Sequence, residues 1–594
     1  MRDAGSETKR ELEPDRPNFM KTEHLATSLG NYEARVRATL AEASSIRVIE
    51  RIWNKDASLW KSDESHQKII RNSLGWLTVA GEMLAVVNEL KSFADAVRAS
   101  GKFQHAMVCG MGGSSLCPEV LRQTFGHQEG FPVLLVLDST DPDAINNFRK
   151  QIDVSRSLFI IASKSGTTTE PNTFHRYWYN EVAKSSDEPG MAFVTITDPG
   201  SQMADAAAAE GFMRIFLNQP DIGGRYSALS YFGMVPAALM GLDLQRMLRR
   251  AETMAQSCGP LVAATENSAA ILGAAMAECA LAGRDKLTVV TDQKLSALGL
   301  WIEQLIAEST GKEGKGVVPI VGESLGAVSA YGNDRLFVSV SVGPVGEETD
   351  SKLKALETAG HPILYRNLAD LYELGAEFFL WEMATAFAGW RLQINPFDQP
   401  NVQESKDKTK ALLDQYTRDG KLPEQTRIAS EAQLNVYGSG EANASVASTS
   451  VRDALRAHCE KIKPGDYVAM LAYIEETEET EAALQMIRTI VRDATGCATT
   501  IGYGPRFLHS TGQLHKGGPD SGVFIQLTAP DKVDLQVPGS SYTFSILKQA
   551  QALGDFQSLA AHGRRAMRID LGLDVLGGMR RLQELLSEAL AGLQ

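Results

Sequence analysis

Short apolar runs alternate with longer amphipathic stretches along most of the chain. Strands that are apolar on both faces and separated by helices predict a parallel sheet that is covered on each side. A long apolar segment after Gly224 predicts a buried helix that closes this first unit near residue 245. The candidate strands of the unit are residues 106–109, 132–138, 157–163 and 192–198.

The same rhythm returns twice further along the chain. A second unit begins near Asn267, with candidate strands at residues 287–292, 316–321, 336–342 and 361–366. A third piece has candidate strands at residues 467–474, 497–503 and 523–528, with a helix near 478–494. The pattern predicts an α/β fold with two doubly wound parallel-sheet domains and a C-terminal α/β domain.

Polar segments set the expected domain boundaries. Residues 1–30 are rich in charged residues and are predicted to be a disordered segment, and GSGEANASVASTS marks residues 431–450 as a linker. Between and beyond these segments we expect a helical lead-in with the first sheet domain (31–250), the second sheet domain (251–430) and the C-terminal α/β domain (451–594).

Composition narrows the class of protein. A formal charge of −14 argues against nucleic acid and anionic membranes as partners. The polar N-terminus lacks the apolar core of a signal peptide, and no apolar run is long enough to span a membrane. The six cysteines are scattered without metal-binding spacing. We therefore expect a cytoplasmic protein with no cofactor and no metal.

A loop rich in hydroxyl groups follows the third candidate strand and opens a helix. Its residues Ser163, Ser165, Thr167 and Thr168 add hydrogen-bond donors without adding charge. Backbone N–H groups at such a helix start stabilise an anion, so the loop predicts a phosphate cradle. The alternative is an ordinary N-capping loop, which would need fewer hydroxyl groups.

A glycine-rich turn, Gly110 to Ser114, follows the first candidate strand. It lacks the spacing of a dinucleotide-binding fingerprint, because the third glycine position is Ser115, and alone it is a weak signal. Its position one strand away from the hydroxyl-rich loop predicts that both line one crevice at the carboxyl ends of the strands.

Four motifs together resemble a known family. GMGGSSLCPEV, SKSGTTTEPNT, GGRYSALS and QLIAESTGKEGKG resemble, in order and spacing, the glucose-6-phosphate isomerases, which are built from two sugar-isomerase domains. The likeness runs from about residue 65 to about residue 415, and it is closest to the isomerase part of bacterial transaldolase–isomerase fusions. The resemblance implies a homo-oligomeric aldose–ketose isomerase that interconverts glucose 6-phosphate and fructose 6-phosphate through a cis-enediol.

The resemblance also implies roles for the residues of the two loops. Ser163, Lys164, Ser165 and Thr168 would hold the phosphate of the sugar, and Gly113 and Ser114 would touch the sugar itself. Glu170 matches a carboxylate near the sugar-binding loop.

Further matches imply the catalytic groups. Arg225 corresponds to an arginine beside the reacting carbons, where a guanidinium stabilises the oxyanion of the enediol. Glu308 corresponds to the general base, whereas composition alone cannot choose it over Glu303 or Glu313. The loop at residues 395–406 implies that Gln399 binds phosphate and that Lys406 assists ring opening.

The ring-opening histidine of the family is missing from its usual place. No histidine lies between Glu308 and His361, and Arg335, nearest to the expected position, cannot shuttle a proton at neutral pH. His509, in the stretch His-Ser-Thr-Gly-Gln, is our candidate for the ring-opening acid/base. The alternative is that His509 and His515 are ordinary loop histidines.

Two other functions stay open. A sugar-phosphate sensor would keep the cradle and lose catalysis, but the presence of Glu308, Arg225 and Lys406 disfavours it. An isomerase that also accepts mannose 6-phosphate would differ in only a few pocket residues.

Overall fold

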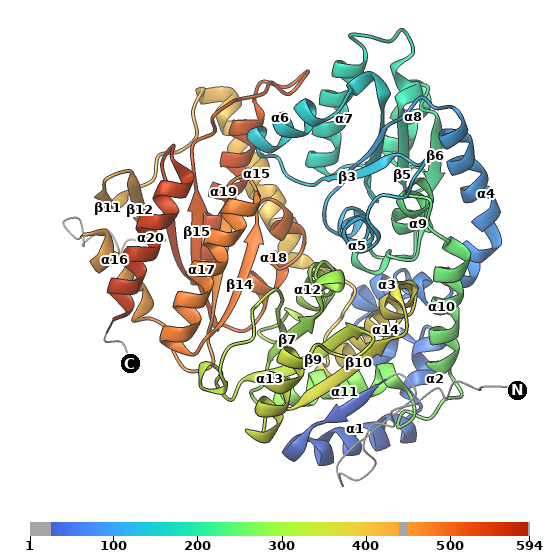
Figure 1. Ribbon diagram of the computed structural model, residues 1–594, viewed down its shortest axis with the longest axis vertical. Helices are drawn as coiled ribbons and strands as arrows, with labels where there is room; N and C mark the ends of the chain where they lie inside the picture. The colour runs from blue at the N-terminus through green and yellow to red at the C-terminus, as the bar shows by residue number, and fades with distance from the viewer. Residues whose placement is uncertain (1–24, 439–449, 592–594) are drawn as a thin grey trace, which may run out of the picture.

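The computed structural model describes residues 25–438 and 450–591. Within them the chain forms three α/β units, each built on a sheet of its own (Figure 1). The predicted fold class is therefore confirmed. The predicted disorder of residues 1–24 and part of the predicted linker, residues 439–449, lie outside the described residues. No helix of the described residues is both long and apolar enough to cross a membrane.

The first sheet is parallel throughout, in the order β3-β2-β4-β5-β6. Its short edge strand β6 was not predicted, because most of its residues are partly exposed. The strands are β2 (His105–Cys109), β3 (Val133–Leu137), β4 (Ser157–Ala162), β5 (Phe193–Thr197) and β6 (Arg214–Leu217).

The second sheet has the order β1-β10-β9-β7-β8, with β1 antiparallel to β10. Residues 26–28 were expected in the disordered segment; instead they form β1, because pairing with β10 satisfies their backbone groups. The strands are β1 (Ala26–Ser28), β7 (Lys286–Thr291), β8 (Val318–Ile320), β9 (Arg335–Val342) and β10 (Ile363–Leu368).

The third sheet has the order β11-β12-β16-β15-β13-β14. The expected linker is wrong for residues 434–438, which form β12 and bury Leu434 and Val436 in the core of this unit. The strands are β11 (Arg427–Glu431), β12 (Leu434–Gly438), β13 (Tyr467–Tyr473), β14 (Ala498–Tyr503), β15 (Gly522–Thr528) and β16 (Arg565–Asp570).

One strand order recurs in all three units. In each sheet the first four parallel strands in chain order lie as second, first, third, fourth: β3-β2-β4-β5, β8-β7-β9-β10 and β14-β13-β15-β16. The strand order reverses beside the first strand of each set, and ligands of open α/β sheets bind at such switch points. The second and third sheets also share an antiparallel strand beyond the fourth.

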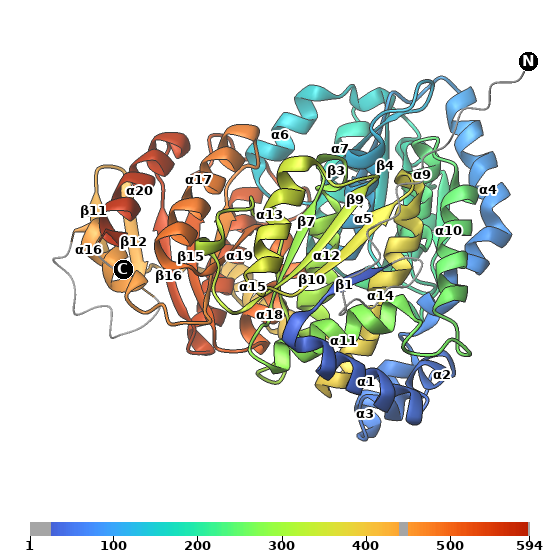
Figure 2. The same ribbon diagram turned by 60° about the horizontal axis from the view of Figure 1, so that its bottom comes forward.

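Helices complete the layers around the sheets, and two of them tie the units together (Figures 1 and 2). The helices are α1 (Glu33–Ser45), α2 (Val48–Trp53), α3 (Glu64–Arg71), α4 (Val79–Ala99), α5 (Leu116–Phe125), α6 (Pro142–Gln151), α7 (Thr169–Val182), α8 (Gln202–Ala209), α9 (Tyr231–Leu239), α10 (Leu244–Ser257), α11 (Ser268–Leu281), α12 (Leu298–Thr310), α13 (Glu347–Thr358), α14 (Leu374–Leu392), α15 (Pro400–Asp419), α16 (Val451–Cys459), α17 (Glu478–Thr495), α18 (Gly512–Gly517), α19 (Phe544–Ala561) and α20 (Val575–Leu590).

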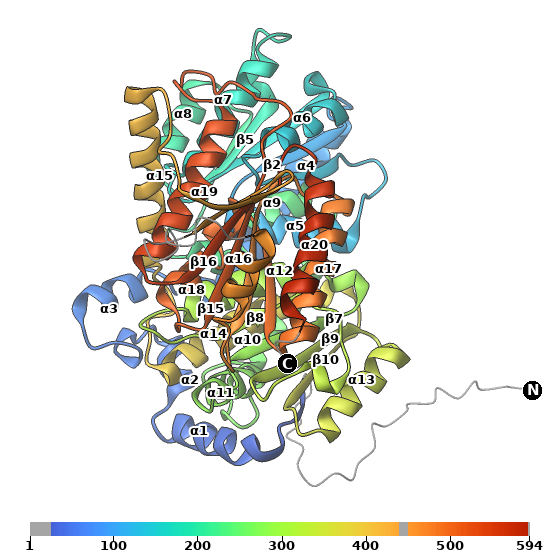
Figure 3. The same ribbon diagram turned by 90° about the vertical axis from the view of Figure 1, so that its left-hand side faces the viewer.

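Helix α14 is buried along nearly its whole length and packs against α10, α11 and α12. Helix α12 lies where the three units meet, in contact with α5 of the first, β8 of the second and α18 of the third (Figure 1). On the outside of the third unit, α15 runs beside α19, as Figure 3 shows. The catalytic base predicted at Glu308 is thus on the helix that all three units surround.

Candidate active site

The glycine-rich turn and the hydroxyl-rich loop lie at the switch point of the first sheet. They follow β2 and β4, which are neighbouring parallel strands on either side of the reversal in strand order. The prediction that the two loops lie at one edge of the first sheet is therefore confirmed, and a ligand-binding crevice between them stays a prediction. Parallel strands bring both loops to the same edge of the sheet, where backbone N–H groups can converge on a ligand.

The hydroxyl-rich loop presents donors that the protein itself does not use. Within the described part of the chain, the buried hydroxyl oxygen of Ser163 has no hydrogen-bond partner, and no side chain caps the N-terminus of α7 at Thr168. Ser165 is exposed, with its Oγ 3.0 Å from Thr167 Oγ1. A buried hydroxyl without a partner is costly unless a ligand satisfies it, which fits a phosphate cradle.

Lys164 lies differently from what the resemblance implied. Its ammonium pairs with Asp198 and donates to the carbonyl oxygen of Pro220 at 2.9 Å. The lysine thereby ties the loop to the neighbouring strand ends. A direct bond from Lys164 to phosphate stays a prediction, since the ammonium would have to exchange partners.

Two glycines let the glycine-rich turn approach the segments that carry Arg225 and His509. A Cβ on Gly113 would lie 1.9 Å from the carbonyl oxygen of Gly224, so a side chain there would collide with the turn that carries Arg225. Gly112 has φ +55°, and a Cβ on it would lie 2.7 Å from the carbonyl oxygen of His509. The turn of Gly113 and Ser114 is therefore packed between the predicted arginine and the predicted histidine.

Arg225 and Glu308 meet in the buried centre of the site. Arg225 Nη1 lies 3.2 Å from Glu308 Oε1, with only 3% and 9% of the two side chains exposed. Around them, Arg225 donates to Ser309 Oγ at 2.7 Å, to Gln399 Oε1 at 3.1 Å and to the carbonyl oxygen of Pro396 at 2.6 Å. So many fixed bonds hold the guanidinium in one orientation beside the carboxylate.

The loop at residues 395–399 is held by a second buried cation. Lys312 Nζ donates to the carbonyl oxygen of Asn395 at 2.6 Å and lies 2.8 Å from Asp398 Oδ1. Burial, together with the nearby charge of Arg225, lowers the pKa of Lys312 to about 7. Lys406, on α15, is exposed, so its ammonium is free to reach a ligand.

His509 is brought to the crevice by the C-terminal unit. Its Nε2 lies 3.0 Å from Glu170 Oε1, and Gln551 Nε2 donates to the same oxygen at 2.7 Å. Burial alone would raise the pKa of Glu170, but the charge and hydrogen bond of His509, aided by Lys406, hold it below its usual value. Glu170 was matched to a carboxylate near the sugar-binding loop; its carboxylate bonds His509 and Gln551, and a contact with the sugar stays a prediction.

Arg335 and His515, the two residues considered beside His509 in the sequence analysis, both have structural surroundings. Arg335 is fully buried and pairs with Glu323 at 3.0 Å. His515 is buried against Phe507 and Phe524, and burial, with help from Lys516 and Arg564, lowers its pKa far below the usual value. His509 is the histidine of this stretch that reaches the crevice.

A loop of the first unit, residues 138–143, docks onto the C-terminal unit; we refer to it as the docking loop. Asp138 forms a bidentate pair with Arg506, with both distances at 2.9 Å. Asp141 Oδ2 lies 2.8 Å from Lys548 Nζ, and Asp143 accepts from the backbone of residues 532 and 533. These contacts fix the segment that carries His509 relative to the first sheet.

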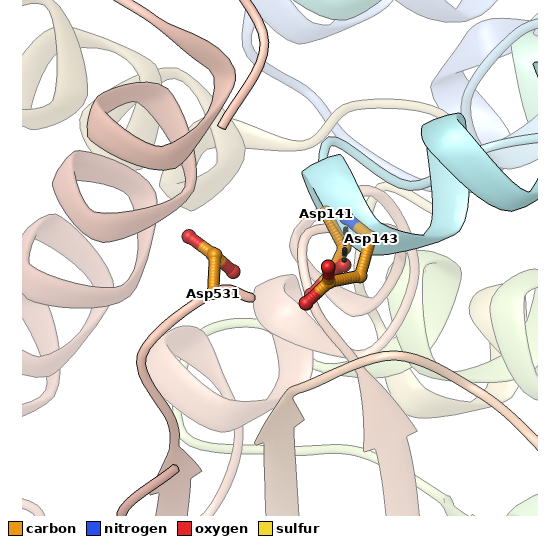
Figure 4. Close-up of side chains that lie close together, drawn as sticks. All are labelled: Asp141, Asp143 and Asp531. Atoms are coloured by element: carbon orange, nitrogen blue, oxygen red, sulfur yellow. Dashed lines mark hydrogen bonds between the residues drawn. The ribbon is translucent and has the colours of Figure 1, made fainter. Parts of the chain in front are cut away.

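The docking loop also contributes two of three clustered carboxylates whose spacing would suit a metal ion. Among the described residues, Asp141, Asp143 and Asp531 form such a group, and Figure 4 shows their carboxylates gathered between α6 and the loop after β15. Lys548 Nζ already pairs with both Asp141 and Asp531. The lysine supplies the compensating charge, so the group acts as a contact between units.

Sequence reasoning missed Gln304, which connects the base to the histidine loop. Its Nε2 donates to Glu308 Oε2 at 3.1 Å and to the carbonyl oxygen of His509 at 2.8 Å. The spacing of Gln304 and Glu308, one helical turn apart on α12, was a usable signal. Lys312 and Gln551 were also missed, because their partners are distant in sequence.

Comparisons with known proteins agree with this arrangement. Residues 65–328 match the family model of phosphoglucose isomerase. Relatives include glucose-6-phosphate isomerases of Cyanothece sp., 28% identical over 56% of this chain and 71% of the relative, and of Rubrobacter xylanophilus, 29% identical over 54% and 84%. The likeness to transaldolase–isomerase fusions stays a prediction.

Solved structures show the same fold. The crystal structure of a glucose-6-phosphate isomerase from Chlamydia trachomatis superposes with a TM-score of 0.56 at 20% identity, covering 67% of this chain and 90% of that one. The motifs of the two loops, Arg225 and Glu308 all lie within the matched residues. The chain therefore carries a phosphoglucose isomerase domain, and the family recognised from its motifs is confirmed.

Proposed function

We propose that this chain interconverts glucose 6-phosphate and fructose 6-phosphate. The observation that carries the proposal is the buried pair of Arg225 and Glu308, 3.2 Å apart, on elements that contact the turn of Gly113 and Ser114. A general base beside a fixed guanidinium is what proton transfer through an enediol requires. Its cytoplasmic location and its assembly into homo-oligomers remain predictions.

The cradle would bind the phosphate group and so place the sugar. Ser163, Ser165 and Thr168 would donate hydrogen bonds, and Gln399, whose Oε1 accepts from Arg225, would bind the phosphate as well. Binding energy from the phosphate, which does not react, can be used to orient the carbons that do.

Ring opening would be the first chemical step. His509 takes the proton of the C1 hydroxyl, which becomes the aldehyde oxygen. It gives that proton to the ring oxygen of glucose 6-phosphate as the bond between C1 and the ring oxygen breaks. Glu170 would hold the imidazole in place, and the charge of Lys406 would assist.

Proton transfer would follow on the open chain. Glu308 takes the proton from C2, which leaves negative charge on O1; the hydroxyl proton of O2 moves to O1 by way of the cis-enediol, and Glu308 returns its own proton to C1, which gives the ketose. Arg225 stabilises the negative charge that develops on the oxygen during this transfer.

A coupled assay on fructose 6-phosphate tests the proposal, with the wild type compared to Glu308→Gln. We expect an active wild type and a loss of about 100-fold or more in the variant, because the amide cannot accept the proton. Binding of phosphosugar without activity in either protein would support the sensor instead. The same assay with mannose 6-phosphate decides whether the enzyme has dual specificity.

A further inference from the structure

Helix α19 presents three polar side chains on one face, at the spacing of residues that share a helix side. They are Lys548, Gln551 and Asp555, and all three are buried. Lys548 pairs with Asp141 of the docking loop, and Asp555 lies 2.7 Å from Lys516 on α18, with both side chains fully buried. The helix is therefore fixed on one side to the first unit and on the other to the segment after His509.

Gln551, between these two contacts, belongs to a continuous chain of hydrogen bonds. Thr140 Oγ1 donates to Gln551 Oε1 at 2.7 Å, and Gln551 Nε2 donates to Glu170 Oε1 at 2.7 Å. His509 Nε2 lies 3.0 Å from that same oxygen. The threonine and the glutamine are buried, so neither has water as an alternative partner.

The hydrogen bonds of this chain run in one direction. An ionised Glu170 can only accept, so the amide nitrogen of Gln551 faces it, and the amide oxygen accepts from the hydroxyl of Thr140. An amide N–H donor favours the ionised carboxylate, which can only accept. Glu170 then accepts a hydrogen bond from the N–H group at His509 Nε2. This bond fixes the histidine tautomer with its proton on Nε2.

We propose that Gln551 is a positioning residue for ring opening: it holds Glu170 as an acceptor and thereby makes Nδ1 the working nitrogen of His509. The proposal rests on the proposed function of His509. It is consistent with the geometry, since Nδ1 bonds no group among the described residues, while Nε2 is engaged. Gln551 touches neither substrate nor reacting atoms and acts through its two partners.

Removing the amide gives a distinctive result. Gln551→Leu leaves Glu170 without one donor, which makes the carboxylate a stronger base and raises its pKa. We expect kcat to fall about tenfold with KM changed less than about threefold, and the acid limb of the pH profile to move up by about one unit. Thr140→Val should move the limb in the same direction but less, because the Gln551 amide can then rotate.

Gln526→Leu is the matched control. Gln526 is also a buried glutamine that bonds α19, through Ala552, but it does not contact Glu170. The Gln526→Leu substitution should lower the free energy of unfolding without moving the acid limb of the pH profile of activity. A Gln551→Leu protein that folds and keeps the wild-type acid limb would overturn the proposal, and so would an equal shift from Gln526→Leu.

Two further measurements keep the test decisive. If Gln551→Leu does not fold, Gln551→Glu preserves the size of the side chain, and its second carboxylate should move the limb upward as well. NMR of protein labelled with [15N]histidine reads the His509 tautomer directly, and we expect the proton on Nε2 in the wild type and a mixture in Gln551→Leu. A proton on Nδ1 in the wild type refutes the positioning role, whereas an inactive wild type with the expected tautomer refutes only the proposed function.

Discussion

His509 Nε2 lies 3.0 Å from Glu170 Oε1, although 339 residues separate the two in the sequence. The contact places a side chain of the third unit in the crevice of the first, next to a base carried by the second. Gln304 links the base to the histidine segment, since it donates to Glu308 and to the backbone carbonyl oxygen of His509. The candidate active site is thus assembled from all three sheets.

Replacing His509 separates ring opening from isomerisation. We expect His509→Asn to lower the rate on glucose 6-phosphate by about 100-fold, because asparagine cannot exchange a proton. A four-carbon sugar phosphate that cannot cyclise should be converted nearly as well as by the wild type. The control is His562→Asn, on the surface of the same unit. Equal losses on the cyclic and the acyclic substrate would contradict the assignment.

Arg225→Lys tests the role of the fixed guanidinium. A lysine cannot make the divergent bonds to Ser309, Gln399 and Pro396 at once, so its charge would be poorly placed. We expect kcat/KM to fall by about 100- to 1000-fold. Arg176→Lys, at an exposed arginine that bonds Ser540, should leave it unchanged. A loss below about threefold for Arg225→Lys would mean that the guanidinium is not used in the transition state.

Lys312→Met tests the loop that carries Gln399. Without the buried ammonium, the carbonyl oxygens and Asp398 that it bonds would lose their donor, and the loop would loosen. We expect KM for the sugar phosphate to rise about tenfold, measured by steady-state kinetics. Lys315→Met is matched, because Lys315 bonds the carbonyl oxygen of Leu392 outside this loop. A larger rise in KM for Lys315→Met would speak against the prediction.

Glu382 makes stability depend on pH. It is fully buried on α14, neither carboxyl oxygen has a partner among residues 25–438 and 450–591, and burial raises its pKa well above the usual value. Because the folded pKa exceeds the unfolded one, stability is greatest below the unfolded pKa and is lost as pH rises toward the folded pKa. This contribution therefore makes the wild type less stable at pH 8 than at pH 5.

Urea unfolding of Glu382→Gln and Glu382→Met at the two pH values measures this effect. Neither side chain ionises, so both variants should lose less stability than the wild type between pH 5 and pH 8. Glu382→Met should exceed the wild type at pH 8 by about 1–3 kcal/mol, since it also removes the unpaired polar atoms. Identical pH dependence in all three proteins would show that Glu382 has a partner in solution.

The local pattern of hydrophobic residues predicted the strands that are buried in the sheets. The strands that are apolar on both faces were found because a continuous run of hydrophobic residues marks a strand that is buried on both sides. The loops after β2 and β4 were found because they directly follow such runs. Strands β1, β6, β11, β12 and β16 were missed, because short or half-polar segments become strands only when a neighbour pairs with them. Long-range contacts such as Gln551 with Glu170 have no local signature, so only the docked units reveal them.

The docking loop has a consequence for how activity depends on the amount of enzyme. The docking loop fixes the segment that carries His509, and His509 and Glu308 belong to one polypeptide. The effective concentration of the histidine at the base is therefore set by covalent connection and not by the meeting of two molecules. Diluting the enzyme then removes neither group from the other. If His509 and Glu308 act as proposed, each folded molecule is a complete catalyst by itself, and we expect turnover per molecule to stay constant as the solution becomes more dilute.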